Sequence, residues 1–167
     1  MKPKIAILMG SDSDYAILEK TTQILQDFEI PFEVRVMSAH RTPEIVSSFV
    51  HTASKRGIKV FIAAAGGAAH LAGAIAAHTI FPVIGVPIAS TELLGLDALY
   101  ATVQMPPGVP VATVAVGKFG AVNAALLAVQ ILAVGDSGLQ RKLQKYKISM
   151  RQKVEKADRE LQKKIQR

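Results

Sequence analysis

The chain has 167 residues, half of them hydrophobic, which suits one domain with a sizeable core and argues against disorder. It has no cysteine, and this excludes disulfides, thiolate metal sites, iron–sulfur clusters and cysteine nucleophiles. The formal net charge is +7, but eleven of the 20 Lys and Arg and only three of the 13 Asp and Glu lie in residues 141–167. We interpret this basic segment as a solvated or subunit-facing helix, and we expect no nucleic-acid partner.

The apolar stretches do not predict a membrane protein. The most apolar one, residues 60–87, is broken by glycine and proline and interrupted by His70 and His78. The apolar start of the chain is too short for a signal peptide. We therefore expect a cytoplasmic protein without a membrane partner.

Five short apolar segments alternate with five helical ones. The predicted strands are residues 5–9, 32–37, 60–64, 83–86 and 111–116, and the predicted helices are residues 14–29, 43–56, 68–79, 91–103 and 121–134. Most of these strands lack polar alternation, which is typical of strands buried on both faces of a parallel sheet. The pattern predicts a three-layer α/β sandwich with a five-stranded parallel sheet and a flavodoxin-like strand order.

The last segment has a different pattern. An apolar residue recurs every three or four positions from Leu139 to Ile165, on a helix that is otherwise charged. We expect residues 1–135 to form the catalytic α/β domain and residues 136–167 to form a long C-terminal helix that packs on a neighbouring subunit.

Ligands of an open α/β sheet bind beyond the carboxyl ends of its strands, so the loops there are the candidate site. The first loop, residues 10–14, reads GSDSD and brings small hydroxyl side chains to a helix start, where anions bind. Taken alone, its residues are better interpreted as ordinary helix caps. The second loop, residues 38–43, reads SAHRTP, and its Arg41 opposes the helix dipole unless an anion lies between.

The third loop, residues 65–73, is built from very small residues around His70, which suits either close approach to a ligand or close helix packing. The fourth loop offers Ser90 and Thr91 as small polar or capping residues. Lys118 follows the last strand, and we interpret it as a solvated turn residue. His51 and His78 fall inside predicted helices, and we interpret both as structural.

Taken together, these loops resemble one family. GSDSD, SAHRTP and AGGAAHL at residues 10–14, 38–43 and 65–71, followed by residues 103–106 and 117–128, resemble the class I N5-carboxyaminoimidazole ribonucleotide mutases, the bacterial PurE proteins. Each motif is weak alone, but their order and spacing are specific over roughly residues 4–135.

The resemblance implies a mutase of purine biosynthesis that converts N5-carboxyaminoimidazole ribonucleotide to 4-carboxy-5-aminoimidazole ribonucleotide. It implies a flavodoxin-like homo-octamer that needs no metal and no cofactor. The roles it implies are phosphate binding by Ser11, Ser13 and Arg41 with support from Ser38, ribose binding by Asp14, proton transfer by His40, and lining of the carboxylate and base region by Gly66 and His70.

The implied chemistry suits an imidazole. Protonating the carbamate nitrogen releases CO2, C4 of the ring then attacks CO2, and a proton finally leaves C4. A histidine, with an ordinary pKa of about 6.5, can give the first proton and take the last. The small residues 65–69 would enclose the CO2.

Two departures and two alternatives accompany this interpretation. Ala72 stands where the family commonly has proline, and we expect activity to survive. The C-terminal helix is also longer and more basic than the family pattern.

The alternative functions are a class II carboxylase that uses free CO2, and a flavodoxin-like FMN-binding protein. Arg41 and the AAHL loop favour class I, and the first three loops lack the aromatic residues that a flavin usually needs.

Overall fold

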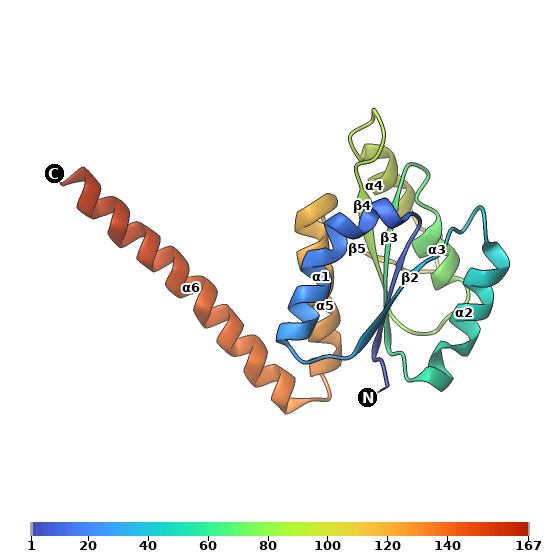
Figure 1. Cartoon of the computed structure of the whole chain (residues 1–167), viewed down its shortest axis with the longest axis horizontal. Helices are drawn as coiled ribbons and strands as arrows, with labels where there is room; N and C mark the ends of the chain where they lie inside the picture. The colour runs from blue at the N-terminus through green and yellow to red at the C-terminus, as the bar shows by residue number, and fades with distance from the viewer. Residues whose placement is uncertain (1, 167) are drawn as a thin grey trace. The chain divides into compact units, whose positions relative to one another are not determined.

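The computed structural model describes residues 2–166. Its centre is an all-parallel sheet of five strands in the order β2-β1-β3-β4-β5, which is the flavodoxin-like order (Figure 1). The strands are β1 (Ile5–Met9), β2 (Phe32–Val36), β3 (Val60–Gly66), β4 (Val83–Ile88) and β5 (Ala112–Thr113). The predicted fold class is therefore confirmed.

The helices are α1 (Tyr15–Asp27), preceded by a short 3-10 helix η1 (Asp12–Asp14), then α2 (Pro43–Arg56), α3 (Leu71–Ala76), α4 (Leu96–Val103), α5 (Gly117–Ala133) and α6 (Ser137–Ile165). The chain divides into two compact units, Met1–Ile131 and Leu132–Arg167. The domain boundary expected at residue 135 falls in the short segment between α5 and α6.

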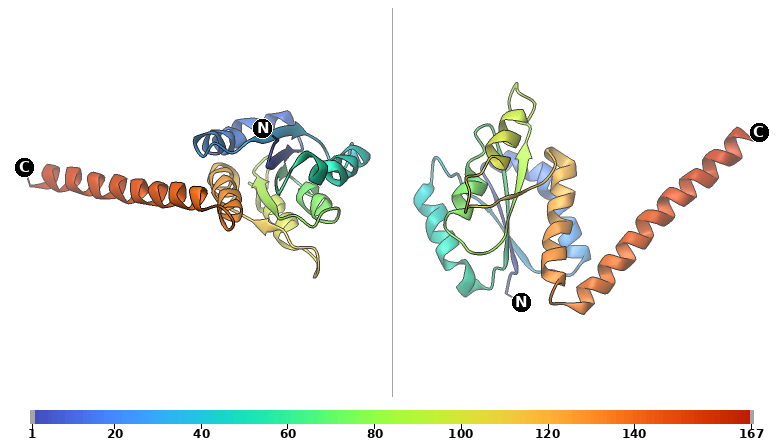
Figure 2. Two further views of the ribbon diagram at one scale, coloured as in Figure 1. Left: turned by 90° about the horizontal axis from the view of Figure 1, so that it is seen from below. Right: turned by 180° about the vertical axis from the view of Figure 1, so that it is seen from behind.

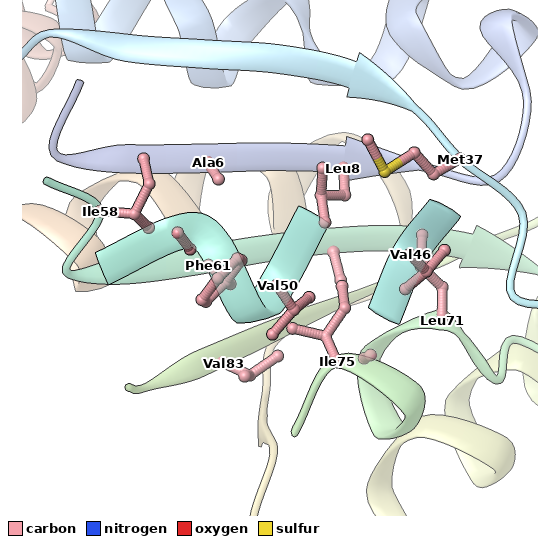
Figure 3. Close-up of a cluster of buried hydrophobic side chains, with 13 residues drawn as sticks. Ala6, Leu8, Met37, Val46, Val50, Ile58, Phe61, Leu71, Ile75 and Val83 are labelled. Atoms are coloured by element: carbon pink, nitrogen blue, oxygen red, sulfur yellow. The ribbon is translucent and has the colours of Figure 1, made fainter. Parts of the chain in front are cut away.

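Helices cover both faces of the sheet. α1 and α5 lie side by side on one face, and α2 and α3 lie on the other (Figure 2). The hydroxyl of Thr21 in α1 donates to the carbonyl of Ala121 in α5 at 2.8 Å, which ties the first pair together. The opposite face of the sheet packs on α2 and α3 through Val46, Val50, Leu71 and Ile75, all buried (Figure 3).

The central strands are buried on both faces of the sheet, and the strand at one edge is partly exposed. β1 and β4 are buried along their whole length, as predicted for strands covered on both faces. β2 is partly exposed, because it forms the edge of the sheet and pairs only with β1. Glu33 and Arg35 alternate with its apolar residues, so β2 is a strand that departs from the pattern of most of the others.

β5 is shorter than predicted, with two residues in place of six. Pro110 precedes it and has no backbone N–H to donate, and α5 begins at Gly117 with a φ of +68° rather than at residue 121. Lys118 therefore lies in the first turn of α5 and not in a loop.

Two helices begin later than predicted because left-handed residues precede them. Gly67 and Ala69 have φ values of +60° and +41° before α3, and Leu94 has a φ of +53° before α4. α3 also ends early, at Ala76, so His78 lies in the segment after the helix and not within it. Ala72 is buried in the first turn of α3, where proline would also be tolerated.

The second unit consists mainly of α6, a 29-residue amphipathic helix. The Asp136 side chain caps it by accepting from the backbone N–H groups of Gly138 and Leu139 at 2.9 and 3.1 Å. Met150, Val154, Leu161 and Ile165 are exposed on the predicted apolar stripe. The packing of this stripe on a neighbouring subunit stays a prediction.

Candidate functional site

Four loops meet at the carboxyl edge of the sheet, namely those that follow β1, β2, β3 and β4 (Figure 1). They enclose a cavity of about 390 Å³. All eight predicted site residues line it: Ser11, Ser13, Asp14, Ser38, His40, Arg41, Gly66 and His70. Residues from three separate loops thus share one site, although their individual roles stay predictions.

The first loop presents two hydroxyl groups and a buried carboxyl. The Ser11 hydroxyl oxygen accepts from the Ser13 hydroxyl at 2.9 Å and caps η1 by accepting from the Ser13 N–H. Asp14 occupies the N-cap position of α1 but makes no capping hydrogen bond. The helix-cap interpretation is therefore right for Ser11 and wrong for Asp14.

The Asp14 carboxyl is only 7% exposed. Burial raises the pKa of Asp14 above the ordinary value; a backbone hydrogen bond with Ser11 offsets part of this rise, and the nearby charge of Asp12 adds to it. The Asp14 carboxyl lies at the cavity wall, where its oxygens can also accept hydrogen bonds from a ligand.

The second loop places Arg41 beside the first one. One Nη2 hydrogen of Arg41 is donated to the carbonyl oxygen of Gly10 at 3.2 Å, so the guanidinium lies next to the residue that precedes Ser11. The loop is held by local bonds: the Ser38 hydroxyl accepts from the Arg41 N–H at 3.2 Å, and the Thr42 hydroxyl accepts from the Ser38 N–H at 3.0 Å. Guanidinium and hydroxyl groups together form one polar end of the cavity, suited to an anion.

The third loop forms a wall of small residues. Ala65, Gly66 and Ala69 line the cavity, and the Ala69 N–H donates to the Gly66 carbonyl at 3.1 Å to close the turn. Ala69 has a φ of +41°, an unfavourable conformation for a residue with a side chain, and such strain is typical of functional sites.

The two histidines of the site contact each other. His40 Nε2 lies 2.7 Å from His70 Nδ1, and the rings meet edge to face with centroids 4.8 Å apart. In a neutral pair, one of these facing nitrogens carries the hydrogen and the other accepts it. The pair therefore holds an exchangeable proton at the wall of the cavity.

The sequence marked Ser90 only as a small polar or capping residue of the fourth loop and gave it no role in the site. It follows β4 and lines the cavity beside Gly66. A Cβ atom on Gly66 would lie 1.9 Å from the Ser90 hydroxyl oxygen, so the missing side chain of Gly66 makes the room that Ser90 occupies. The loop beyond Ser90 is fixed by the Thr91 hydroxyl, which donates to the Asp97 carboxylate at 2.6 Å and lowers the Asp97 pKa.

Among residues 2–166, no three or more His, Cys, Asp and Glu side chains gather in a way that could hold a metal ion. No helix in that range is both long and apolar enough to cross a membrane.

The fold and the cavity define a doubly wound α/β protein with its ligand site at the carboxyl edge of the sheet. The profile of the family described as AIR carboxylase matches residues 4–153. The chain is 54% identical over 149 residues to the N5-carboxyaminoimidazole ribonucleotide mutase of Pyrococcus abyssi, covering 89% of this chain and 84% of that protein. It is 52% identical to the mutase of the same name from Bacillus subtilis, covering 92% of this chain and 95% of that one.

A solved structure gives the same result for the fold. Treponema denticola PurE2-S38D superposes with a TM-score of 0.87 at 32% identity, covering 96% of this chain and 99% of that chain. The chain belongs to the AIR carboxylase family.

Proposed function

We propose that this protein is an N5-carboxyaminoimidazole ribonucleotide mutase, an isomerase that yields 4-carboxy-5-aminoimidazole ribonucleotide in purine biosynthesis. The observation that carries the proposal is the His40–His70 contact in a cavity that has a cationic, hydroxyl-rich end and a small-residue wall. The family membership and the names of the relatives support the same reaction.

The polar end would hold the ribonucleotide by its phosphate. Arg41 can make two parallel hydrogen bonds to phosphate, and the hydroxyls of Ser11 and Ser13 can add donors beside it. Ser38 would act indirectly, because its hydroxyl accepts from the Arg41 backbone and holds that loop. Asp14 would accept from ribose hydroxyls.

The histidine pair would perform the proton transfers. Protonation of the carbamate nitrogen breaks its bond to the carboxyl carbon, and the bond electrons remain on that nitrogen as CO2 leaves. C4 of the ring then attacks CO2, and loss of the C4 proton restores aromaticity. His40 would give the first proton and take the second, so the enzyme returns to its starting protonation state.

The wall at Ala65, Gly66 and Ala69 would retain the CO2 between the two steps. Small side chains let the backbone approach a small nonpolar molecule closely and leave little room for water. Retention makes the second step effectively unimolecular, which avoids the entropic cost of a new encounter. Binding of the remote phosphate supplies the energy for this positioning.

We also propose assembly into a homo-octamer in which the apolar stripe of α6 packs on a neighbouring subunit. The exposed side chains of Met150, Val154 and Leu161 support this, because a charged helix with an apolar face is stabilised by packing that face. A cytoplasmic location and the lack of a nucleic-acid partner stay predictions.

The test of the function is turnover of purified protein on the N5-carboxylated ribonucleotide, with and without added bicarbonate. We expect product at equal rates in both, because the transferred CO2 comes from the substrate. Turnover only of the decarboxylated ribonucleotide with added bicarbonate would instead identify a CO2-dependent carboxylase.

A further inference from the structure

A second pair of histidines lies away from the cavity described above. His51 is exposed on α2, His78 is exposed in the segment after α3, and the centroids of their rings are 5.3 Å apart. Both line a surface hollow of about 410 Å³, together with the hydroxyl-bearing residues Ser54 and Thr79. The hollow shares no lining residue with the His40 cavity.

The hydrogen bond at one nitrogen of His51 determines the state of the other. His51 Nδ1 lies 2.7 Å from the carbonyl oxygen of Ser47, which can only accept, so Nδ1 carries the hydrogen. In the neutral ring, Nε2 then keeps its lone pair. Metal-binding histidines typically have this arrangement, in which the ring nitrogen that does not bind the metal donates its hydrogen to a carbonyl or carboxylate oxygen.

The distance between the two ring centroids matches the distance that one shared ion requires. A zinc–nitrogen bond of about 2.0–2.1 Å puts each ring centroid roughly 3.2 Å from the ion, and a tetrahedral angle then separates two centroids by about 5.2 Å. The observed separation is 5.3 Å, with the ring planes inclined by 47°.

The facing nitrogens of His40 and His70 are too close together to hold a zinc ion between them. His40 Nε2 and His70 Nδ1 are 2.7 Å apart, whereas two nitrogens on one tetrahedral zinc ion stay about 3.3–3.4 Å apart. A proton fits between His40 and His70, and an ion would have to separate them.

We propose that His51 and His78 form a two-histidine site for a divalent transition-metal ion such as Zn2+, tying α2 to the segment that follows α3. The lining of the hollow offers imidazole and hydroxyl groups and no carboxylate, which suits zinc, nickel or copper and not magnesium or calcium. Water would complete the coordination, because the described residues provide no third histidine or carboxylate there. This metal site is separate from the cavity of the proposed reaction, in which His51 and His78 have no role.

Calorimetric titration of the full chain with Zn2+ at neutral pH tests the proposal. We expect one ion per chain, with affinity reduced more than about tenfold in both His51→Gln and His78→Gln. The matched control is His40→Asn, which alters the other histidine pair and should bind zinc as the unchanged protein does. Mg2+ should give no saturable heat.

Thermal unfolding provides a second measurement on the same proteins. Zn2+ should raise the melting temperature of the unchanged protein and of His40→Asn, and leave His51→Gln and His78→Gln unaffected, because an ion that binds only the folded state stabilises it. The zinc effect should weaken in acid, because protons compete with the ion for the imidazole nitrogens. No saturable zinc binding, or binding that survives both replacements or is lost in His40→Asn, would overturn the proposal.

Discussion

His40 Nε2 and His70 Nδ1 are 2.7 Å apart, although the two residues follow strands that are not neighbours in the sheet. β1 lies between β2 and β3, so the loops that carry the histidines meet across the carboxyl end of β1. The proposed mechanism gives these two histidines unequal roles. In the proposal, His40 would transfer the proton, and His70 would line the carboxylate and base region.

The first prediction separates these roles by substitution. His40→Asn should keep the fold and ligand affinity but lower kcat by about a hundredfold or more, the effect expected for a lost general acid–base. His70→Asn should cost less, because the asparagine amide can still form a hydrogen bond to His40. Steady-state kinetics, with calorimetric ligand binding as the control for folding, decide between them. A near-normal kcat in His40→Asn would transfer the proton role to His70.

The second prediction concerns the fit between Gly66 and Ser90. Gly66→Ala should reduce turnover and lower the melting temperature, because the new methyl group would lie 1.9 Å from the Ser90 hydroxyl oxygen. Adding Ser90→Gly should restore part of the stability, since it removes the atoms that clash. Thermal unfolding of the two single variants and the double variant measures this coupling. Strictly additive effects would show that the two residues do not constrain each other.

Asp14 gives a prediction about pH. Because burial raises the pKa of this acid in the folded state, the charged form destabilises the fold at neutral pH. The stability that protonation provides is complete below the unfolded pKa and is lost as the pH rises through the folded pKa. Asp14→Asn should therefore raise the melting temperature at pH 7, by roughly 2–4 °C for each kcal/mol gained, and this gain should shrink toward pH 3.

The same variant should weaken ligand binding if Asp14 accepts from the ribose. A stability gain that is independent of pH would contradict the role of the buried charge. Unchanged ribonucleotide affinity would contradict the ribose assignment, and it would leave the stability argument intact.

Much of this arrangement follows from local sequence. α2 has the predicted bounds, because Pro43 suits a first helical turn and Gly57 suits the left-handed residue after a helix. The site loops were predictable because each follows an apolar run, and ligands bind where parallel strands end.

Other features depend on distant parts of the chain. The exposure of β2 follows from its edge position, and the His40–His70 contact follows from the order of three strands. Ser90 enters the site through a gap at Gly66, and no local pattern marks that gap. The late starts of α3 and α4 depend on left-handed turns at Ala69 and Leu94, residue types that rarely adopt them.

The fourth prediction concerns α6. Deleting residues 147–167 removes Met150, Val154, Leu161 and Ile165, the exposed apolar residues of its stripe. If these pack on a neighbouring subunit, light scattering should show a smaller or less stable oligomer. An octamer of unchanged size and stability would mean that this part of the helix has no role in assembly.

The central claim is that the carboxyl group moves within one bound ribonucleotide. The most direct measurement uses substrate labelled with 13C in the N5-carboxylate, turned over by the unchanged protein in unlabelled bicarbonate and followed by carbon NMR. We predict that the first product formed carries the label at its C4 carboxylate, because the CO2 released in the cavity is captured there. Unlabelled product whose formation requires bicarbonate would contradict this account and would indicate that CO2 enters from solution.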